Sequence, residues 1–450
     1  MPKTKNKKYY LKTFGCQSNM ADSDRIRWIA ESCGYASTPK ENVADLIIYN
    51  TCSVRQSAED RIFGRNKIIK QLKTKNSKLK IILTGCMMHY GEKTLKKRMP
   101  LVDFFLPIRE LQKLPKLMGK KAVVNPEEYL SIPPKHEFPF RAWVPISYGC
   151  NNFCTFCIVP FARGREYSRP KNEIIREVKD AIRTSHKEIW LLGQNVNSYG
   201  ITEKTAWEGK TRKNALPVIQ KGRVTFAELM REINAIPGKF WIRFTSAHPK
   251  DFSDDLISAM ATCEKFPKYI NLPVQSGDND VLTRMNRNYT REDFIKLIKK
   301  IRAAIPDIAI STDTIVGFPG ETKKAFMNTA KLYREIGFDM AFIAEYSMRS
   351  GTAASITFAD NVPHAEKERR RKYLNEILKK SALEKSRPLL RQTMELLVDE
   401  YKNGRFFGKS PQNKNVEIKG ADSNQKINIG DFVKVEITDV TAWKWEGQLV

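Results

Sequence analysis

Three closely spaced cysteines constrain this chain more than any other feature. Cys150, Cys154 and Cys157 lie within eight residues of one another. Thiolates bind cuboidal four-iron clusters, and three of them would leave one iron open for a substrate or cofactor. Zinc fits the spacing less well, because structural zinc ligands usually come in pairs and a fourth is needed. Buried apolar cysteines are common, but three in so short a segment indicate a metal site.

A second set of three cysteines lies in the first 125 residues, where strands alternate with helices. The expected strands are 8–13, 45–50, 80–84 and 103–106. The expected helices are 21–33, 54–73 and 90–98. This alternation predicts an open parallel sheet built of βαβ units. Cys16, Cys52 and Cys86 each follow the end of one expected strand by two or three residues. Because such ends share one edge of the sheet, where ligands bind, we expect the three thiols to converge. If the three cysteines were simply buried independently, nothing would place them at one edge of the sheet. Cys33 and Cys263 have no other cysteines near them in this pattern, so we expect them to be ordinary core or surface residues.

A new series of strands and helices begins after a linker at 125–140, which contains four prolines. Its expected strands are 143–147, 188–192, 241–245, 269–272, 309–316 and 340–346, with helices that include 172–183, 225–236 and 291–304. Six such units predict a partial (β/α)6 barrel. The Cys150 set follows the first strand, at the C-terminal mouth where barrel enzymes place their chemistry.

Polar residues follow several later strands of this expected barrel. Gln194 comes after the second strand, Ser246 and His248 after the third and Gln275 after the fourth. We expect His248, which precedes a proline, to cap a turn. The glycine-rich segment 317–321 is by itself typical of a tight connection.

The last part of the chain changes pattern after a basic helical segment at about 364–385. Segments 396–400, 415–418 and 432–438 alternate apolar and polar residues, with glycines between them. Short strands of this kind predict a small antiparallel β-barrel, or an accessory sheet packed on the larger barrel. The α/β chain is thus expected to form three domains, 1–125, 136–385 and 388–450.

Charge is distributed unevenly along the chain. The formal net charge is +28, and the first 125 residues carry 26 Lys and Arg against 10 Asp and Glu, whereas the last 63 carry nine of each. A polyanionic partner such as RNA or DNA fits this balance, although a generally basic proteome would also produce it. No window approaches the ~18 apolar residues of a membrane span, and no signal peptide is apparent. We therefore expect a cytoplasmic protein with no membrane partner. In the cytoplasm, clustered cysteines are more often metal ligands than disulfides.

The segment Gly149–Pro160 resembles the signature of radical S-adenosylmethionine (SAM) enzymes, with Phe156 as the aromatic residue before the last cysteine. The whole chain is similar to the methylthiotransferases, and most similar to the tRNA-2-methylthio-N6-dimethylallyladenosine synthases. The segments that carry this resemblance are Thr13–Asn19, Asn50–Asp60, Gly149–Pro160, Arg163–Glu166, Ser168–Pro170, Leu191–Tyr199, Leu272–Gly277 and Ile315–Thr322. Position 18 is Ser where that subfamily usually has Met, and the segment Arg287–Thr290 is reminiscent of the threonylcarbamoyladenosine methylthiotransferases.

The resemblance implies an N-terminal domain, a radical SAM core and a C-terminal TRAM domain that binds RNA. It implies one [4Fe-4S] cluster on Cys16, Cys52 and Cys86, and a second on Cys150, Cys154 and Cys157. Two SAM molecules would be used per turnover: one methylates a sulfur at the first cluster, and the other yields the 5′-deoxyadenosyl radical that activates the substrate adenine. Candidate SAM-binding residues are Phe156, Gln194, Ser246 and Gln275. The implied partners are a tRNA anticodon stem-loop and an electron donor of flavodoxin or ferredoxin type, with the enzyme a monomer.

Three alternative functions remain at this stage. A threonylcarbamoyladenosine or a ribosomal-protein aspartate could be the methylthiolated group instead. Relatives that act on the ribosomal protein usually carry a more acidic TRAM domain, whereas this one is neutral. A non-catalytic iron–sulfur RNA-binding protein would share the cysteines but would not cleave SAM.

Overall fold

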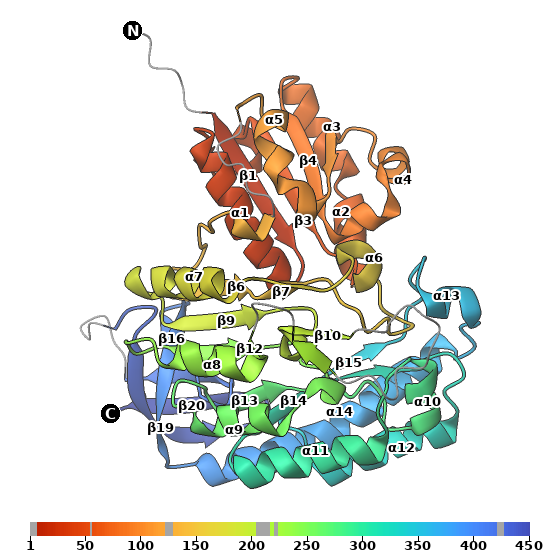
Figure 1. The fold of residues 1–450 in the computed structure, drawn as a ribbon, viewed down its shortest axis with the longest axis vertical. Helices are drawn as coiled ribbons and strands as arrows, with labels where there is room; N and C mark the ends of the chain where they lie inside the picture. Colours follow the sequence, from red (N-terminus) through yellow and green to blue (C-terminus); the bar gives the residue numbers. More distant parts are fainter. Residues whose placement is uncertain (1–6, 55, 122–128, 204–216, 220–223, 421–426) are drawn as a thin grey trace.

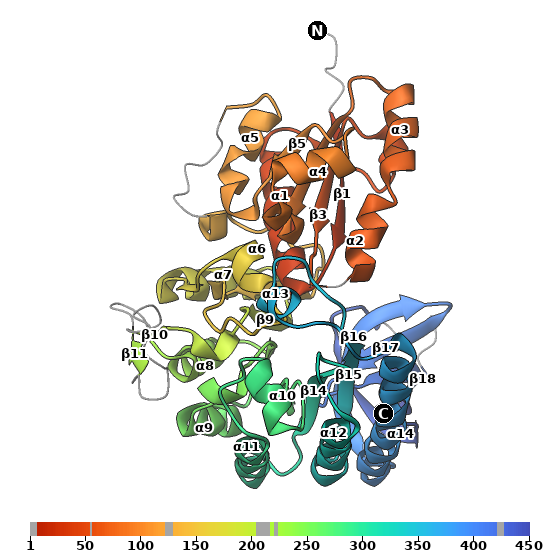
Figure 2. The same ribbon diagram turned by 90° about the vertical axis from the view of Figure 1, so that its right-hand side faces the viewer.

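The computed structural model describes residues 7–54, 56–121, 129–203, 217–219, 224–420 and 427–450. An N-terminal α/β unit lies above a larger α/β unit, and a C-terminal barrel packs beside the latter (Figures 1 and 2). Across this part of the chain, no helix has both the length and the apolar character that a bilayer span demands.

The N-terminal unit is an entirely parallel five-stranded sheet with the strand order β2-β1-β3-β4-β5. Its strands are β1 (Lys8–Phe14), β2 (Ala36–Ser37), β3 (Leu46–Thr51), β4 (Lys80–Gly85) and β5 (Phe104–Leu106), and its helices are α1 (Gln17–Ser32), α2 (Gln56–Phe63), α3 (Asn66–Lys75), α4 (Glu92–Arg98) and α5 (Leu114–Leu117). Side chains alternate along β3: Ile48 packs toward α1 and α5, while Ile47 packs toward α2, α3 and α4. The predicted open parallel sheet is therefore confirmed, with helices on both faces.

The single helix expected at 54–73 is wrong. The chain forms α2 and α3 instead, which are separated at Gly64 and Arg65. The Arg65 guanidinium donates to the hydroxyl of Tyr49 at 3.1 Å and forms an ion pair with Glu41. These bonds to the sheet hold Arg65 at the point where the helix would otherwise continue.

The central unit contains six parallel strands that form two sheets of three, β12-β9-β6 and β13-β14-β15. The strands are β6 (Arg141–Pro145), β9 (Glu188–Leu192), β12 (Trp241–Phe244), β13 (Tyr269–Asn271), β14 (Ala309–Val316) and β15 (Met340–Glu345), and the helices are α6 (Val159–Arg163), α7 (Lys171–Arg183), α8 (Phe226–Asn234), α9 (Asp254–Thr262), α10 (Asn279–Arg284), α11 (Arg291–Ala304), α12 (Lys323–Ile336), α13 (Ala353–Thr357) and α14 (His364–Ser386). Two short antiparallel pairs accompany them, β7 (Ser147–Tyr148) with β8 (Tyr167–Ser168) and β10 (Ile201–Glu203) with β11 (Pro217–Ile219). The expected partial barrel is thus present, but with a break between β12 and β13.

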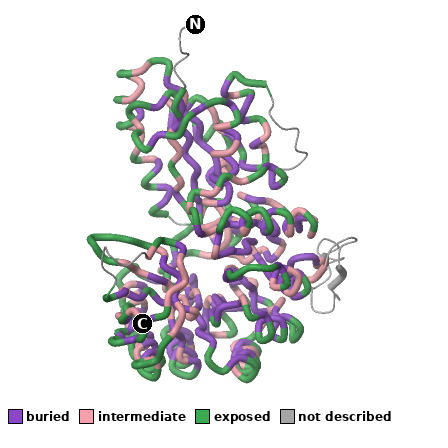
Figure 3. The backbone as a smooth tube through the Cα atoms, turned by 90° about the vertical axis from the view of Figure 1, so that its left-hand side faces the viewer, coloured by how far each residue is buried: buried purple, intermediate pink, exposed green. Residues whose placement is uncertain are grey.

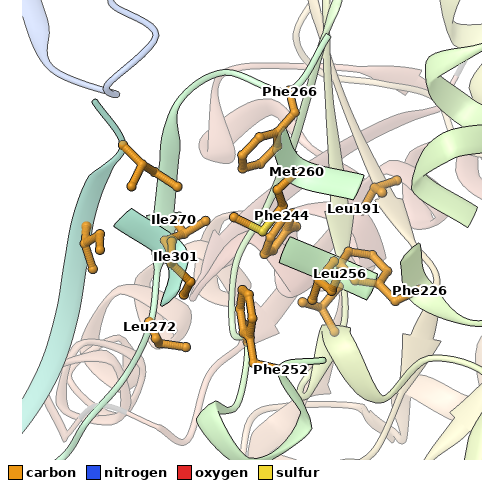
Figure 4. Close-up of a cluster of buried hydrophobic side chains, with 14 of the residues drawn as sticks. Leu191, Phe226, Phe244, Phe252, Leu256, Met260, Phe266, Ile270, Leu272 and Ile301 are labelled. Carbon is orange, nitrogen blue, oxygen red and sulfur yellow. The ribbon is translucent and has the colours of Figure 1, made fainter. Parts of the chain in front are cut away.

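The core of the central unit lies between these sheets and their outer helices. Phe226 of α8, Phe244 of β12, Met260 of α9 and Ile270 of β13 meet in this layer (Figure 4). Buried residues run along the strands of both α/β units, whereas many exposed positions lie on the helices α11, α12 and α14 (Figure 3). Since helices cover this face of the sheets, the opposite face and the strand ends are left for ligands.

The C-terminal unit is a closed five-stranded barrel, β16-β17-β18-β20-β19. Its strands are β16 (Thr393–Lys402), β17 (Arg405–Lys409), β18 (Asn415–Lys419), β19 (Phe432–Val440) and β20 (Lys444–Leu449). The expectation of an antiparallel barrel needs one correction, because β18 and β20 pair in parallel. β19 lies between them in sequence and runs antiparallel to β20, so barrel closure brings two strands of the same direction together.

The barrel is anchored to the central unit. Arg243 of β12 donates to the carbonyl of Ser410 at 3.1 Å, and Lys414 donates to the carbonyl of Asp339 at 2.7 Å. The rings of Trp241 and Phe432 lie 5.2 Å apart in an edge-to-face contact. The C-terminal barrel is therefore an integral part of the molecule and covers the end of the central sheet that lies opposite the cysteine loop.

Candidate active site

The three N-terminal cysteines follow three neighbouring strands at the same level. Phe14, Thr51 and Gly85 are paired across β1, β3 and β4, and the cysteines come one or two residues later. From β1 the chain first adds β2 on one side of β1. It then crosses back to add β3 on the other side of β1, and β4 follows next to β3. This reversal between β1 and β3 creates a crevice outside the carboxyl ends of the strands, and Cys16 and Cys52 stand at that crevice.

Backbone geometry fixes the direction of these thiols. Cys16 is the N-cap of α1, and its backbone N–H donates to Asn19 Oδ1 at 3.3 Å. The thiol sulfur of Cys52 accepts from the backbone N–H of Val54 at 3.3 Å. Gly85 has φ +96°, and a Cβ atom there would lie 2.3 Å from the carbonyl oxygen of Thr51. The turn before Cys86 therefore requires glycine.

The second set lies on the loop that follows β7. Gly149 has φ +73°, and a Cβ there would meet the carbonyl oxygen of Arg165 at 2.1 Å. Phe153, between the first two cysteines, also has a positive φ of 49°, and strain of this kind persists only where the surroundings impose it. The side-chain amide of Asn286 imposes it, because it donates to the carbonyls of Asn152 and Phe153 at 3.1 and 3.0 Å.

Two further contacts hold the far end of this loop. The Thr155 backbone N–H donates to the carbonyl of Met285 at 3.1 Å, and Ala354 of α13 donates to the carbonyl of Thr155 at 2.8 Å. The segment before α13 also reaches the N-terminal unit, since Arg349 donates to Gln56 Oε1 at 2.7 Å. The loop is thus held between α10 and α13, beneath the N-terminal sheet (Figure 2).

The two cysteine sets lie near each other. Helix α6, which begins two residues after Cys157, contacts the short helix that begins at Cys86. Arg163 at the end of α6 is buried and forms an ion pair with Asp22 of α1 at 2.6 Å. Burial raises the pKa of the Cys86 thiol, and the nearby Arg163 guanidinium partly offsets this rise.

Burial also governs the second set. Burial raises the pKa of Cys150 well above its usual range. Burial also raises the pKa of Cys157 to about 12, and the neighbouring thiols of Cys154 and of Cys86, from the other set, add to this rise. The Cys150 and Cys157 thiols therefore remain protonated at neutral pH unless metal binding displaces the protons.

Among the described residues, no three His, Cys, Asp or Glu side chains are placed to hold a single metal ion. Thiolates bound to different irons of a cluster stand farther apart than ligands of one ion. Each set gathers three cysteines, the first at one edge of the sheet and the second on one loop.

The four candidate SAM-binding residues differ in their backbone conformation and packing. Ser246 and Gln275, which follow β12 and β13, have left-handed φ values of 63° and 67°. Phe156 packs against a buried apolar cluster of Val281, Met285, Phe318 and Tyr346. Ser246 and Gln275 are non-glycine residues in a strained conformation at strand ends, a pattern that clusters at ligand sites.

Gln194 has a contact that the sequence did not indicate. Its Nε2 donates to Ser18 Oγ at 3.3 Å, and Ser18 lies two residues after Cys16. Its Oε1 is buried and, among the described residues, has no hydrogen-bond partner. The amide therefore connects the central unit to the N-terminal cysteine region and keeps one acceptor available for a ligand.

Other expectations concern structural residues. His248 Nδ1 accepts from the backbone N–H of Lys250 at 3.2 Å, so the predicted turn cap is confirmed. Cys33 and Cys263 are buried in apolar clusters, as expected for core residues. In the glycine-rich turn, Glu321 accepts from the Gly317 N–H at 2.6 Å and pairs with Arg370 of α14.

Sequence analysis did not single out two arginines as site residues. Arg163 contacts the region of Cys86, and Arg287 donates to Cys154 Sγ at 3.5 Å. Arg163 comes six residues after Cys157, but its partner Asp22 is 141 residues away. Arg287 is 133 residues from Cys154. No local pattern identifies such contacts before the chain has folded.

Comparison with known proteins gives a consistent assignment. Residues 144–333 match the radical SAM superfamily, residues 8–107 match the uncharacterized protein family UPF0004, and residues 388–450 match the TRAM domain. The tRNA-2-methylthio-N(6)-dimethylallyladenosine synthase of Carboxydothermus hydrogenoformans is 40% identical over 99% of each chain. The chain belongs to this synthase family. The protein of the same name from Acetivibrio thermocellus is 42% identical, over 99% of this chain and 92% of its own. That from Thermoanaerobacter sp. (strain X514) is 39% identical, over 100% of this chain and 94% of its own.

Solved structures support the fold at low sequence identity. The radical SAM methyltransferase TsrM from Kitasatospora setae superposes with a TM-score of 0.55 at 12% identity, covering 78% of this chain and 77% of its own. The radical SAM enzyme OxsB gives a TM-score of 0.51 at 12% identity, over 82% and 56% of the two chains. The family membership makes this chain an enzyme that uses an iron–sulfur cluster and SAM.

Proposed function

We propose that this enzyme adds a methylthio group to C2 of N6-dimethylallyladenosine beside the anticodon of tRNA. One observation carries the proposal: two sets of three cysteines, from two different domains, lie close together across the contact between α6 and the turn at Cys86. A reaction that inserts sulfur into an unactivated carbon needs a radical source and a sulfur source at one substrate. The family relatives, which share the full length of the chain, are named for this reaction.

We assign an auxiliary [4Fe-4S] cluster to Cys16, Cys52 and Cys86 and a SAM-binding [4Fe-4S] cluster to Cys150, Cys154 and Cys157. When bound, these groups supply the radical and sulfur-transfer chemistry, as cofactors do in such enzymes. The fit rests on the three thiols of each set and on the donors directed at their sulfurs, the Val54 N–H at Cys52 and the Arg287 guanidinium at Cys154.

The protein's own residues hold the two cysteine sets in place. We assign the binding of SAM to Phe156, Gln194, Ser246 and Gln275. The segment before α13 bridges the two units through Arg349, which also donates to the carbonyl of Val54 at 3.2 Å. This bridge and the Arg163–Asp22 pair hold the two cysteine sets at a fixed separation, which a two-cluster reaction requires.

We propose Phe342 as an apolar contact for the dimethylallyl group. Phe342 of β15 is 49% exposed, and its strand neighbours Ala341 and Ile343 pack into the core on the opposite face. Burying four or five apolar carbons contributes on the order of 3–4 kcal/mol at ~0.8 kcal/mol per CH₂, which corresponds to a preference of several hundredfold. We therefore infer that the enzyme acts after prenylation of the base.

The partners follow from this assignment. We propose a tRNA anticodon stem-loop as the substrate, bound in the cytoplasm with help from the TRAM barrel, and a flavodoxin or ferredoxin as the electron donor to a monomeric enzyme. The division into an auxiliary-cluster domain (1–125), a radical SAM core (136–385) and an RNA-binding domain (388–450) assigns one of these tasks to each part.

Mass spectrometry of tRNA nucleosides tests the proposal. Cells that lack the gene should lose 2-methylthio-N6-dimethylallyladenosine and regain it with the wild-type gene. Purified enzyme should modify prenylated anticodon loops and leave unprenylated ones almost unchanged. Efficient reaction of an unprenylated or threonylcarbamoylated loop, or of a ribosomal-protein aspartate, would refute the substrate assignment, and absence of SAM cleavage would refute the enzymatic one.

A further inference from the structure

Arg287 is a buried arginine whose side chain contacts a cysteine of the central loop. It is 7% exposed and lies three residues after the end of α10. Its Nη1 donates to Cys154 Sγ at 3.5 Å, its Nε to the hydroxyl of Tyr289 at 2.8 Å and its Nη2 to the carbonyl of Pro273 at 2.8 Å. Three of its donors are thus used, and one of them is directed at a thiol.

The charge of Arg287 is compensated differently from that of every other buried arginine in the described part of the chain. The other five form ion pairs with carboxylates, namely Arg25 and Arg169 with Glu177, Arg163 with Asp22, Arg243 with Glu188 and Arg370 with Glu321. Within the same residues, Arg287 forms no ion pair with Asp or Glu. A buried charge is costly unless it is paired, so this guanidinium needs an anion that no described Asp or Glu supplies. Thiolate ligands of a cluster would supply it at Cys154.

We propose that Arg287 is a positioning residue that raises the reduction potential of the cluster bound by Cys150, Cys154 and Cys157. The inference rests on the proposed function, because it assumes a cluster on these three thiols. Reduction transfers one electron from an external donor to the cluster, without proton transfer and without making or breaking a bond in the protein. The cluster gains negative charge in this step, and a fixed cation with an N–H directed at one of its sulfurs stabilises the reduced form.

The cation described beside the auxiliary site differs from Arg287 in its pairing. Arg163 lies near Cys86, but Asp22 neutralises it at 2.6 Å. A dipolar ion pair stabilises added negative charge much less than an isolated cation does. Among the described residues, Arg287 has no carboxylate partner, so we expect it to favour reduction of the cluster on the central loop more than the Arg163–Asp22 pair favours reduction of the other cluster.

The test is a redox titration followed by electron paramagnetic resonance, with dithionite as the reductant. It uses the full-length chain with Cys16, Cys52 and Cys86 replaced by Ala, so that only one cluster contributes. In this background, Arg287→Gln should make reduction at least tenfold less favourable, which lowers the midpoint potential by about 59 mV for one electron. Arg287→Lys, which keeps the charge, should restore part of the shift.

Arg284→Gln is the matched control. Arg284 is three residues away, is partly buried and donates to the carbonyl of Gly320 at 3.1 Å rather than to a cysteine. Its removal should leave the potential unchanged. Tyr289→Phe removes a hydroxyl that accepts from Arg287 and orients it, so it should lower the midpoint potential by a smaller amount. If Arg287→Gln binds no cluster, Tyr289→Phe provides the measurement instead.

Each outcome decides a different point. An unchanged potential in Arg287→Gln with full iron content would overturn the inference and leave Arg287 a purely structural residue. An equal shift in Arg284→Gln would overturn the role of the sulfur contact. Absence of a cluster from the parent background would instead refute the assignment of Cys150, Cys154 and Cys157, which is a failure of the proposed function rather than of the inference.

Discussion

The two cysteine sites of this protein are assembled by opposite means. Cys150, Cys154 and Cys157 belong to one eight-residue loop, which bonds from the turn after α10 and from α13 hold in a strained conformation. Cys16, Cys52 and Cys86 come from three strand ends that the parallel sheet places side by side. The first site depends on local backbone geometry, whereas the second depends on the register of a whole domain. Similar three-thiol sites can therefore be encoded at very different distances along a sequence.

The largest expected effect separates the roles of the two sites. Reconstituted wild-type protein should contain about eight irons per chain, four for each set of cysteines. Replacing Cys150, Cys154 and Cys157 by Ala should remove about half of the iron and abolish SAM cleavage. Replacing the N-terminal three should also halve the iron but preserve some uncoupled cleavage, measured as 5′-deoxyadenosine. If both triple variants lost cleavage equally, this division of roles would be wrong.

Single glycine substitutions should distinguish the loop site of Cys150, Cys154 and Cys157 from the strand-end site of Cys16, Cys52 and Cys86. Gly85→Ala and Gly149→Ala each place a Cβ within 2.3 Å of a backbone oxygen at positive φ, and backbone strain alone costs on the order of 1–3 kcal/mol. Each variant should lose iron only from its own set, as measured by iron analysis. Gly91→Ala is the control, because its φ is +77° but nothing lies within 4 Å of the added atom. Iron loss in the control would mean that φ strain, and not the close contact, is responsible.

Arg163 offers a test of the connection between the sites. Arg163→Gln leaves Asp22 buried without its cation and disturbs the surroundings of Cys86. Loss of such a supporting residue typically costs 10–100-fold in activity, so methylthio transfer should fall by that factor while SAM cleavage is largely retained. Arg165→Gln, at an exposed arginine that stacks on Phe153, should have little effect. A parallel fall in cleavage and transfer would contradict a specific effect on the auxiliary site.

The smallest effect concerns RNA affinity and contrasts the N-terminal domain with the TRAM barrel. Lys67, Lys70 and Lys75 are exposed on α3, whereas Arg405 and Lys419 of the barrel are paired with Glu417 and Glu446. Replacing the three lysines by Gln should reduce the slope of log Kd against log salt by roughly 0.7–0.9 for each phosphate that the protein no longer neutralises. Replacing the two barrel residues should leave the slope nearly unchanged. The opposite pattern in tRNA-binding titrations would assign the electrostatic contacts to the barrel.

Much of this fold was accessible from the sequence, because hydrophobic periodicity marks strands and helices wherever one face is buried. The strands at 188–192 and 309–316 and the helix at 291–304 lie where they were expected. The elements that were missed or misjudged are those that depend on distant partners. The break at Gly64 requires Arg65 to reach Tyr49 and Glu41, and the parallel pairing of β18 with β20 requires the barrel to close.

The same distinction applies to the site. The sequence by itself predicted which cysteines belong together, because spacing marks the loop set and strand ends mark the other, and it predicted the order of the three domains. Only the tertiary structure decided what surrounds the thiols: Gln194 against Ser18, Arg163 against Asp22 and Arg287 against Cys154. Sequence patterns reflect the burial and backbone geometry of nearby residues. The compensation of a buried charge depends instead on which distant side chains the fold brings within a few ångströms, and no local pattern contains that information.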